Sequence, residues 1–255
     1  MEHLSEAYRY RSLIVDWSPI VRSYVGIDGR ADCSIRLASG LRFDILDASD
    51  AWTLVQVAAR NDYRIRPTEP WQTVIDIGAN LGVFAVLAAK AAPDARILCY
   101  EPGSDTCRLL RRNVQANDIG DRTEIHEVAV AGSEGRASLS GRRSSTRRLV
   151  TDGRGRRDAI DVETVTLEAI FQQHRIAQCD MLKMDCEGSE YEIVLGCRRH
   201  VLERIQRMVV EYHEAGSPGS SRALVQELRN CGFRVEELVD PLARTGYLFG
   251  TRGSQ

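Results

Sequence analysis

The sequence lacks the features of secreted, metal-ribbon and membrane proteins. Its seven cysteines are an odd number and form no Cys-x-x-Cys pair, which argues against a disulfide framework and against a zinc ribbon. The opening residues MEHLSEAYRYRS contain no apolar signal-peptide core. No apolar run reaches the roughly 18–20 residues that a membrane helix needs. We therefore expect a cytoplasmic protein with buried free thiols and no membrane span.

The sequence also lacks a dominant sign of charge. Lysine and arginine number 34 against 36 acidic residues, and the net charge is −2. Overall charge therefore predicts neither nucleic-acid binding nor an acidic tail. The dinucleotide fingerprint Gly-x-Gly-x-x-Gly is absent as well, so no pyrophosphate site is expected. What is present is an ordinary apolar content of 43% over 255 residues, enough for one large α/β domain of roughly 200–250 residues.

The chain divides into an N-terminal extension, residues 1–70, and a domain at 71–255. In the extension, residues 34–46 alternate polar and apolar side chains around Ser39-Gly40, which predicts a hairpin. Residues 51–60 have helical spacing with Asp50 as the expected N-cap. Two prolines within residues 64–70 then interrupt regular structure.

From residue 73 onward, short apolar runs alternate with helix-like segments, which predicts a parallel α/β sheet. The expected strands are residues 73–78, 96–101, 123–130, 180–185 and 207–213, followed by an antiparallel pair at 233–239 and 246–251. A further strand start and a helix capped by Thr166 are expected across residues 161–174.

Residues 141–161 interrupt this alternation of strands and helices, and their composition predicts an exposed loop. The segment 142–157 holds seven arginines, at positions 142, 143, 147, 148, 154, 156 and 157. A solvated loop is one interpretation. The other is a clamp for an anionic or phosphorylated acceptor. Aromatic residues are absent from the segment, which argues against a nucleic-acid partner.

The first candidate site is the turn Asp76-Ile77-Gly78-Ala79-Asn80-Leu81-Gly82, directly after a strand. Its glycines permit a close backbone approach to a ligand, and the next helix directs its N-terminal amides there. By itself this is also an ordinary strand-to-helix turn. Glu101 ends the following strand, where a carboxylate can accept hydrogen bonds from ribose hydroxyls. Asp76 adds negative charge where S-adenosylmethionine carries its amino group and sulfonium.

The second candidate site is the strand end Leu182-Lys183-Met184-Asp185-Cys186-Glu187-Gly188-Ser189-Glu190. Asp185 and Glu187 are expected at the mouth of the sheet, near the reacting groups. The alternative is a helix cap formed by Ser189 or Glu190. His213 ends the next strand and is either a general base or a surface histidine.

The segments TVIDIGANLGVFAV, CYEP, MLKMDCEGSEYEIVLG and MVVEYH together resemble the FkbM-type methyltransferases over roughly residues 60–215. The resemblance implies a Rossmann-like class I fold, with a seven-stranded, mostly parallel sheet, one reversed strand and helices on both faces. It also implies S-adenosylmethionine as cofactor and O-methylation of a small-molecule natural product, sugar or lipid-linked glycan.

The resemblance further assigns residues to the cofactor. It places Asp76, Gly78, Asn80 and Gly82 beside the methionine part, Glu101 at the ribose, and Ala129 with Val130 at the adenine. Asp185 and Glu187 match the family's acidic pair at the reaction centre. We also expect cofactor contacts from Ala79, Pro102, Ser104 and Asp185.

The expected mechanism is direct methyl displacement by an acceptor oxygen. The base is His213 or Asp185, and a Mg²⁺ ion held by Asp185, Glu187 and His213 is an alternative. Other functions left open are an RNA methyltransferase and a non-catalytic S-adenosylmethionine-binding protein. The extension and the arginine-rich segment are expected to shape the acceptor pocket. The acceptor and the oligomeric state, a homodimer included, are not readable from the sequence.

Overall fold

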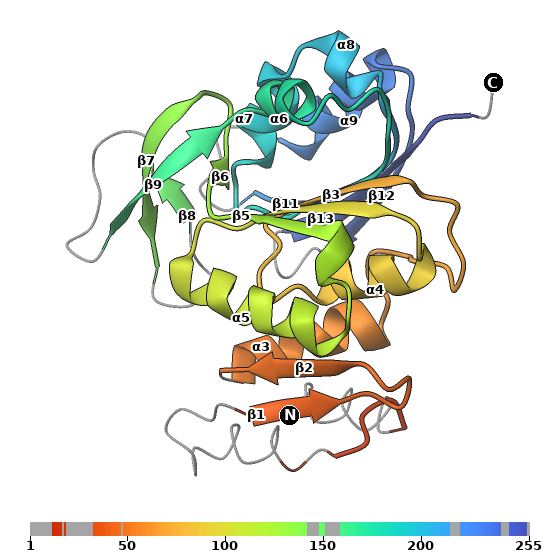
Figure 1. The fold of residues 1–255 in the computed structure, drawn as a ribbon. Coiled ribbons are helices and arrows are strands. Elements are labelled where there is room, and N and C mark those ends of the chain that lie inside the picture. The colour runs from red at the N-terminus through yellow and green to blue at the C-terminus, as the bar shows by residue number, and fades with distance from the viewer. Residues whose placement is uncertain are drawn as a thin grey trace.

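A computed structural model of the chain describes residues 12–16, 18, 33–46, 48–141, 148–150, 159–214, 220–240 and 245–253. These residues form a central sheet with helices on both faces and a smaller sheet beside one edge (Figure 1). None of the helices within these ranges has the length and apolar run required to cross a bilayer.

The central sheet has seven strands in the order β12-β13-β11-β10-β3-β4-β5. The strands are β3 (Thr73–Ile77), β4 (Arg96–Tyr100), β5 (Thr123–His126), β10 (Cys179–Met184), β11 (Ile205–His213), β12 (Arg234–Asp240) and β13 (Thr245–Thr251). Strand β13 runs antiparallel to both of its neighbours, and the other neighbouring pairs are parallel. The predicted sheet with one reversed strand is therefore confirmed.

Helices cover both faces of this sheet (Figure 1). On one face lie α4 (Val83–Ala91) and α5 (Ser104–Ala116). On the other lie α6 (Leu167–Gln173), α7 (Glu190–Gly196), α8 (Arg199–Leu202) and α9 (Ser221–Asn230). The alanine-rich α4 is buried nearly all round, whereas α5 is amphipathic and buries one stripe. As predicted, Thr166 caps α6, because its hydroxyl accepts a hydrogen bond from the Ala169 amide at 3.2 Å.

The N-terminal extension contains the predicted hairpin of β1 (Cys33–Arg36) and β2 (Arg42–Ile45), which turns at Gly40 with φ +89°. Helix α3 (Ala48–Leu54) follows and continues into a π-helical turn, η1 (Val55–Ala59). The prediction that Asp50 caps this helix was wrong, because α3 begins two residues earlier. Asp50 lies in its first turn, where it accepts a hydrogen bond from the Leu46 amide at 2.8 Å.

The smaller sheet was missed by the sequence analysis. It consists of β6 (Ala129–Val130), β7 (Gly135–Ser140), β8 (Arg148–Val150) and β9 (Ile160–Val165), in the order β6-β9-β7-β8. The predicted strand 123–130 is divided between the two sheets, and the predicted loop 141–161 contains β8 and the start of β9. Leu139, Val162 and Ala129 form a small core of their own. Of the seven arginines, all but Arg148 lie outside the described residues.

Two asparagines, one in α5 and one at its C-cap, attach the hairpin to the domain. Asn113 is buried; its Nδ2 donates to the carbonyls of Leu81 at 2.8 Å and Asp44 at 3.2 Å, and its Oδ1 accepts from the Asp44 amide at 2.6 Å. Asn117, one turn later and partly exposed, makes the same pair of bonds with the backbone of Arg42. The extension is thereby joined to the turn after β3.

We expect Asn113→Ala to lower the free energy of unfolding by about 3 kcal/mol, because it leaves buried backbone groups without partners. Asn117→Ala is the matched control. It removes the same kind of bonds at a partly exposed position, so its loss is expected below about 1 kcal/mol. Urea unfolding of both variants measures the difference, and equal losses would contradict the role given to burial.

Candidate active site

The site is built where the turn after β3 meets the turn after β10. Gly78 has φ +71°, and a Cβ at this position would collide with the Asp185 carbonyl. The Asp185 amide donates to the Ile77 carbonyl at 3.1 Å. The absence of a side chain at Gly78 therefore lets the two backbones pack directly against each other.

A buried lysine supports these turns from below. Lys183 Nζ donates to the Gly78 carbonyl at 2.6 Å and to the Ile77 carbonyl at 3.3 Å, and it lies 3.2 Å from Asp76 Oδ1. Burial raises the pKa of Asp76, and Lys183 only partly opposes this. Burial lowers the pKa of Lys183, but the charges of Asp76 and Asp185 more than offset it, so the net shift is upward. Asp76 thus has a structural partner.

A first cavity opens above this support. Its lining comes from the ends of β3, β4 and β10 and from the smaller sheet, and comprises Ile77, Gly78, Asn80, Tyr100, Glu101, Pro102, Ala129, Val130, Leu139, Leu149, Asp185, Cys186 and Glu187. Glu101 is 8% exposed. Its Oε1 accepts from the Gly103 amide at 2.8 Å and its Oε2 from the Asn80 amide at 3.1 Å. Both oxygens are therefore held in place at the edge of the cavity.

Asn80 supplies a second ligand group to the first cavity. It adopts a left-handed backbone with φ +50°. Its Oδ1 is buried and has no hydrogen-bond partner in the protein. Strained backbone and an unpartnered buried acceptor are typical of ligand sites. A diol-accepting carboxylate, an amide acceptor and a glycine-lined backbone together fit the ribose and amino-acid parts of S-adenosylmethionine.

Most of the predicted cofactor residues line the first cavity: Gly78, Asn80, Glu101, Pro102, Ala129 and Asp185. Four do not. Asp76 lies beneath it, paired with Lys183. Ala79 is buried with its amide bonded to the Tyr100 carbonyl, Gly82 begins α4 and packs against Leu110, and Ser104 is exposed at the start of α5.

The sequence analysis missed Leu139 and Leu149 as lining residues. Both belong to the smaller sheet, and only the alternation around Leu139 was available as a signal. Leu149 lies within the segment predicted as a loop.

The turn after β10 is held by Glu190 at the start of α7. This buried carboxylate accepts from the Cys186 amide at 2.8 Å with Oε1 and from the Gly188 amide at 2.9 Å with Oε2. Glu187, between them, adopts a left-handed backbone with φ +55°. The capping interpretation is therefore borne out by Glu190, whereas contact of Asp185 and Glu187 with cofactor or substrate stays a prediction. Glu190 organises the turn, and Asp185 with Glu187 faces the cavity.

His213 packs behind this turn. Its Nδ1 lies 3.3 Å from Glu190 Oε1 and its Nε2 lies 3.7 Å from Glu187 Oε2. Burial lowers its pKa, but Glu190, Asp185 and Glu187 outweigh burial and raise the pKa of His213 to about 9. A histidine protonated at neutral pH cannot accept a proton. The role of His213 as the base stays a prediction, and its raised pKa favours Asp185, the other candidate.

Asp185 and Glu211, two partly buried carboxyl groups, contact the same hydroxyl. Tyr63 Oη lies 3.3 Å from Asp185 Oδ2 and 3.2 Å from Glu211 Oε2. Burial, and then the charge of Asp185, raises the pKa of Glu211 to about 8. A hydroxyl carries one proton, so both contacts are satisfied when protonated Glu211 donates to Tyr63 and Tyr63 donates to Asp185. Neither residue was predicted. Glu211 shares a strand face with His213, but no motif indicated Tyr63.

A second cavity, of about 270 Å³, lies on the other side of Asp185. Its lining includes much of the extension and comprises Ser49, Trp52, Thr53, Gln56, Val57, Asp62, Tyr63, Asn80, Asp185, Glu187, Glu211 and Tyr247. The two cavities share Asn80, Asp185 and Glu187. A ligand in one cavity therefore meets a ligand in the other beside these three residues.

The sheet order and this site define a class I S-adenosylmethionine-dependent methyltransferase. Residues 76–235, more than half of the chain, match the methyltransferase FkbM domain. The chain belongs to the FkbM methyltransferase family.

Individual similarities agree with this family. The 31-O-demethyl-FK506 methyltransferase FkbM of Streptomyces tacrolimicus is 24% identical over 242 residues, which cover 82% of this chain and 92% of that protein. The antimetabolite synthetase AmbE of Pseudomonas aeruginosa is 25% identical over 68% of this chain, which spans only 10% of AmbE. A solved chain from Clostridium thermocellum, assigned as an rRNA-methylase, shares the fold with a TM-score of 0.50 and 9% identity, over 78% of this chain and 96% of that one.

We expect stability to fall as pH rises through about 9, because a histidine with a raised pKa stabilises the folded state only while protonated. The contribution of His213 is complete below pH 6.5, the ordinary pKa, and amounts to about 3 kcal/mol. The raised pKa of Glu211 likewise makes stability fall as pH rises, between pH 4.5 and about 8. Urea unfolding between pH 8 and pH 9 measures the share of His213, because above pH 9 the thiols whose pKa burial raises add a loss in the same direction.

In that range His213→Asn is expected to flatten the pH dependence, whereas His200→Asn, at an exposed position on α8, is expected to leave it unchanged. A wild-type protein whose stability does not change between pH 7 and pH 10 would contradict the assignment.

Proposed function

We propose that the protein methylates a hydroxyl group of an acceptor bound in the second cavity. The observation that carries this proposal is the meeting of the two cavities at Asn80, Asp185 and Glu187. A methyl donor in the first cavity and an acceptor in the second would be held in contact at a carboxylate. The relative from Streptomyces tacrolimicus is named for methylation at an oxygen, which supports the same acceptor atom here.

The residues of the chain supply alignment and proton transfer. Bound S-adenosylmethionine supplies an electrophilic methyl group. Glu101 accepts hydrogen bonds from the ribose hydroxyls, and Asn80 Oδ1 accepts one from the amino group. Asp185 takes the proton of the acceptor hydroxyl, which raises the nucleophilicity of its oxygen. The residues that line the two cavities would keep the two reactants aligned.

Tyr63 and Glu211 hold the base in position. Tyr63 donates to Asp185 Oδ2, and we assign the other oxygen, Oδ1, to the acceptor hydroxyl. Glu211 acts as a neutral carboxylic acid that keeps the Tyr63 hydroxyl turned toward Asp185. In this arrangement Asp185 is the catalytic base, and Glu211 and Tyr63 are positioning residues.

A divalent cation is a second candidate for activating the hydroxyl. Asp185, Glu211 and His213 each offer one ligand atom, and these atoms lie within 4.8 Å of one another. The set differs from the predicted one, because Glu211 replaces Glu187. Carboxylates are ligands that Mg²⁺ prefers. A bound cation would relieve the repulsion between Asp185 and Glu211, as a proton on Glu211 does. In that case Glu211 would have to be ionised and His213 would have to be neutral.

The isosteric pair Glu211→Gln and Asp185→Asn separates these mechanisms. If Glu211 works as a neutral acid, glutamine replaces it and kcat falls only a few-fold. Loss of the base in Asp185→Asn is expected to cost roughly 10²–10⁴-fold in kcat. Turnover of labelled S-adenosylmethionine measures both, with cofactor binding followed by calorimetry. The alternative predicts equal losses in the two variants and loss of activity with EDTA, restored by Mg²⁺.

The second cavity also bears on the class of acceptor. Four of its lining side chains are carboxyl groups, namely Asp62, Asp185, Glu187 and Glu211. Trp52, Tyr63 and Tyr247 add aromatic surface. Carboxyl groups that accept hydrogen bonds, together with flat aromatic rings, suit a ligand that carries several hydroxyl groups or an amine. The charges of the carboxylates repel an anionic ligand. The anionic acceptor remains a prediction that depends on arginines outside the described residues, so we propose a neutral or cationic polyol.

Acceptors matched except for charge test this class. We expect a hexoside or amino-hexoside to be methylated with at least tenfold higher kcat/KM than the uronate of the same ring, the difference lying mainly in KM. Labelled S-adenosylmethionine reports the product. Preference for the uronate would overturn the proposed class. Methylation of RNA in the same assay, or cofactor binding with no turnover of any acceptor, would overturn the proposed function.

A further inference from the structure

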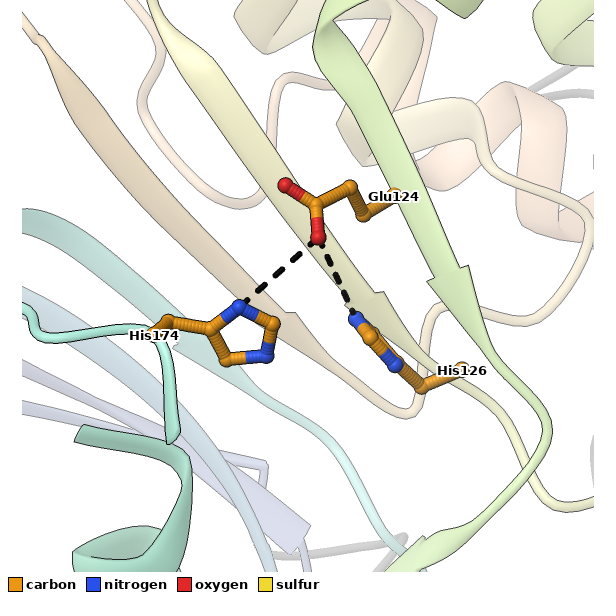
Figure 2. A group of neighbouring side chains, drawn as sticks. All are labelled: Glu124, His126 and His174. Carbon is orange, nitrogen blue, oxygen red and sulfur yellow. Dashed lines mark ion pairs between the residues drawn. The ribbon is translucent and has the colours of Figure 1, made fainter. Parts of the chain in front are cut away.

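A second cluster of ligand-type side chains lies at the edge of the central sheet, outside both cavities. Strand β5 points Glu124 and His126 to the same face, and His174 reaches them from the end of α6. Figure 2 shows the three side chains converging, with the Glu124 carboxylate between the two imidazole rings. Two imidazoles and one carboxylate are a ligand set used by zinc.

The distances in the cluster are close to those of a metal site. Glu124 Oε2 lies 3.7 Å from His174 Nδ1 and 4.0 Å from His126 Nε2. One ligand atom from each residue lies within 4.8 Å of the others. In tetrahedral zinc sites the ligand atoms are roughly 3.3 Å apart, from bonds of about 2.0–2.1 Å. Small side-chain rotations would close the difference.

Each histidine offers one ring nitrogen to the cluster. His126 Nε2 is buried and has no hydrogen-bond partner. His174 Nδ1 accepts from Arg96 at 2.9 Å, so its Nε2 carries the proton and donates to Tyr100 Oη at 3.0 Å. Such a bond from the second ring nitrogen is typical of metal-ligating histidines.

Arg96 now occupies the position that a metal ion would take. Its Nε lies 2.7 Å from Glu124 Oε1, and a terminal nitrogen holds the His174 Nδ1 lone pair. The Arg96 side chain is 42% exposed, so it can turn into solvent. We propose that Glu124, His126 and His174 form a site for a zinc-class divalent ion, which binds in exchange for the Arg96 guanidinium.

The ion would join elements that border the first cavity. It would link β5 to the end of α6, and the backbone of β5 continues directly to that cavity, because the His126 carbonyl accepts from the Glu101 amide at 3.1 Å. Tyr100, which lines the cavity, stacks on His126 at 4.7 Å between ring centroids. The site would therefore stabilise the edge of the sheet beside the bound cofactor.

Titration of the tag-free, chelator-stripped full chain with Co²⁺ tests the site, followed by visible absorption and by competition with Zn²⁺. We expect one saturable ion. Glu124→Gln, His126→Gln and His174→Gln should each weaken binding at least tenfold. Arg96→Met should tighten it at least tenfold, because it removes the competing cation. His200→Gln, at an exposed histidine, is the matched control and should bind like the wild type.

Circular dichroism of each variant confirms folding, and Glu124→Gln alters a side chain that is 45% exposed, so its folding is not expected to suffer. Absence of saturable binding in both the wild type and Arg96→Met would overturn the proposal. Binding that persists in all three ligand variants but is lost in His213→Gln would overturn it as well, because the ion would then belong to the Asp185 cluster.

Discussion

The active site depends on one buried ion pair, between Lys183 of β10 and Asp76 of β3. The parallel register places the two residues directly opposite each other, and both are almost completely buried. Lys183 also donates to the carbonyls of Ile77 and Gly78, so a single ammonium group neutralises Asp76 and holds the turn after β3. Removing either partner of such a pair leaves a buried charge without its counter-charge. The stability lost is then far larger than the net stabilisation that the intact pair provides.

Above this pair the protein concentrates negative charge around Asp185. Glu187, Glu190 and Glu211 all surround it, and they are tolerated because protons and backbone amides are arranged among them. Glu190 accepts from two amides, and the pKa values of His213 and Glu211 are both raised. The environment of each group, rather than its residue type, therefore sets how readily it binds a proton.

The two cavities are completed by parts of the chain outside the central sheet. Residues of the smaller sheet close the first cavity, and α3, η1 and the segment after them form much of the second. In open α/β sheets, ligands bind beyond the carboxyl ends of the strands, where connecting segments vary most easily. The same central sheet can therefore serve different acceptors when the extension that lines the second cavity changes.

The sequence by itself determined the sheet, its reversed strand and the positions of Gly78, Glu101 and Asp185. These are local signals: each lies at the end of an apolar run, and parallel strands bring their carboxyl ends to one edge. Only the tertiary structure decided what each group does there. Asp76 is buried against Lys183, neighbouring carboxylates raise the pKa of His213, and Tyr63 comes from a segment without a motif. Burial and neighbouring charges decide these roles, and both depend on contacts between residues far apart in the chain, which no spacing along it encodes.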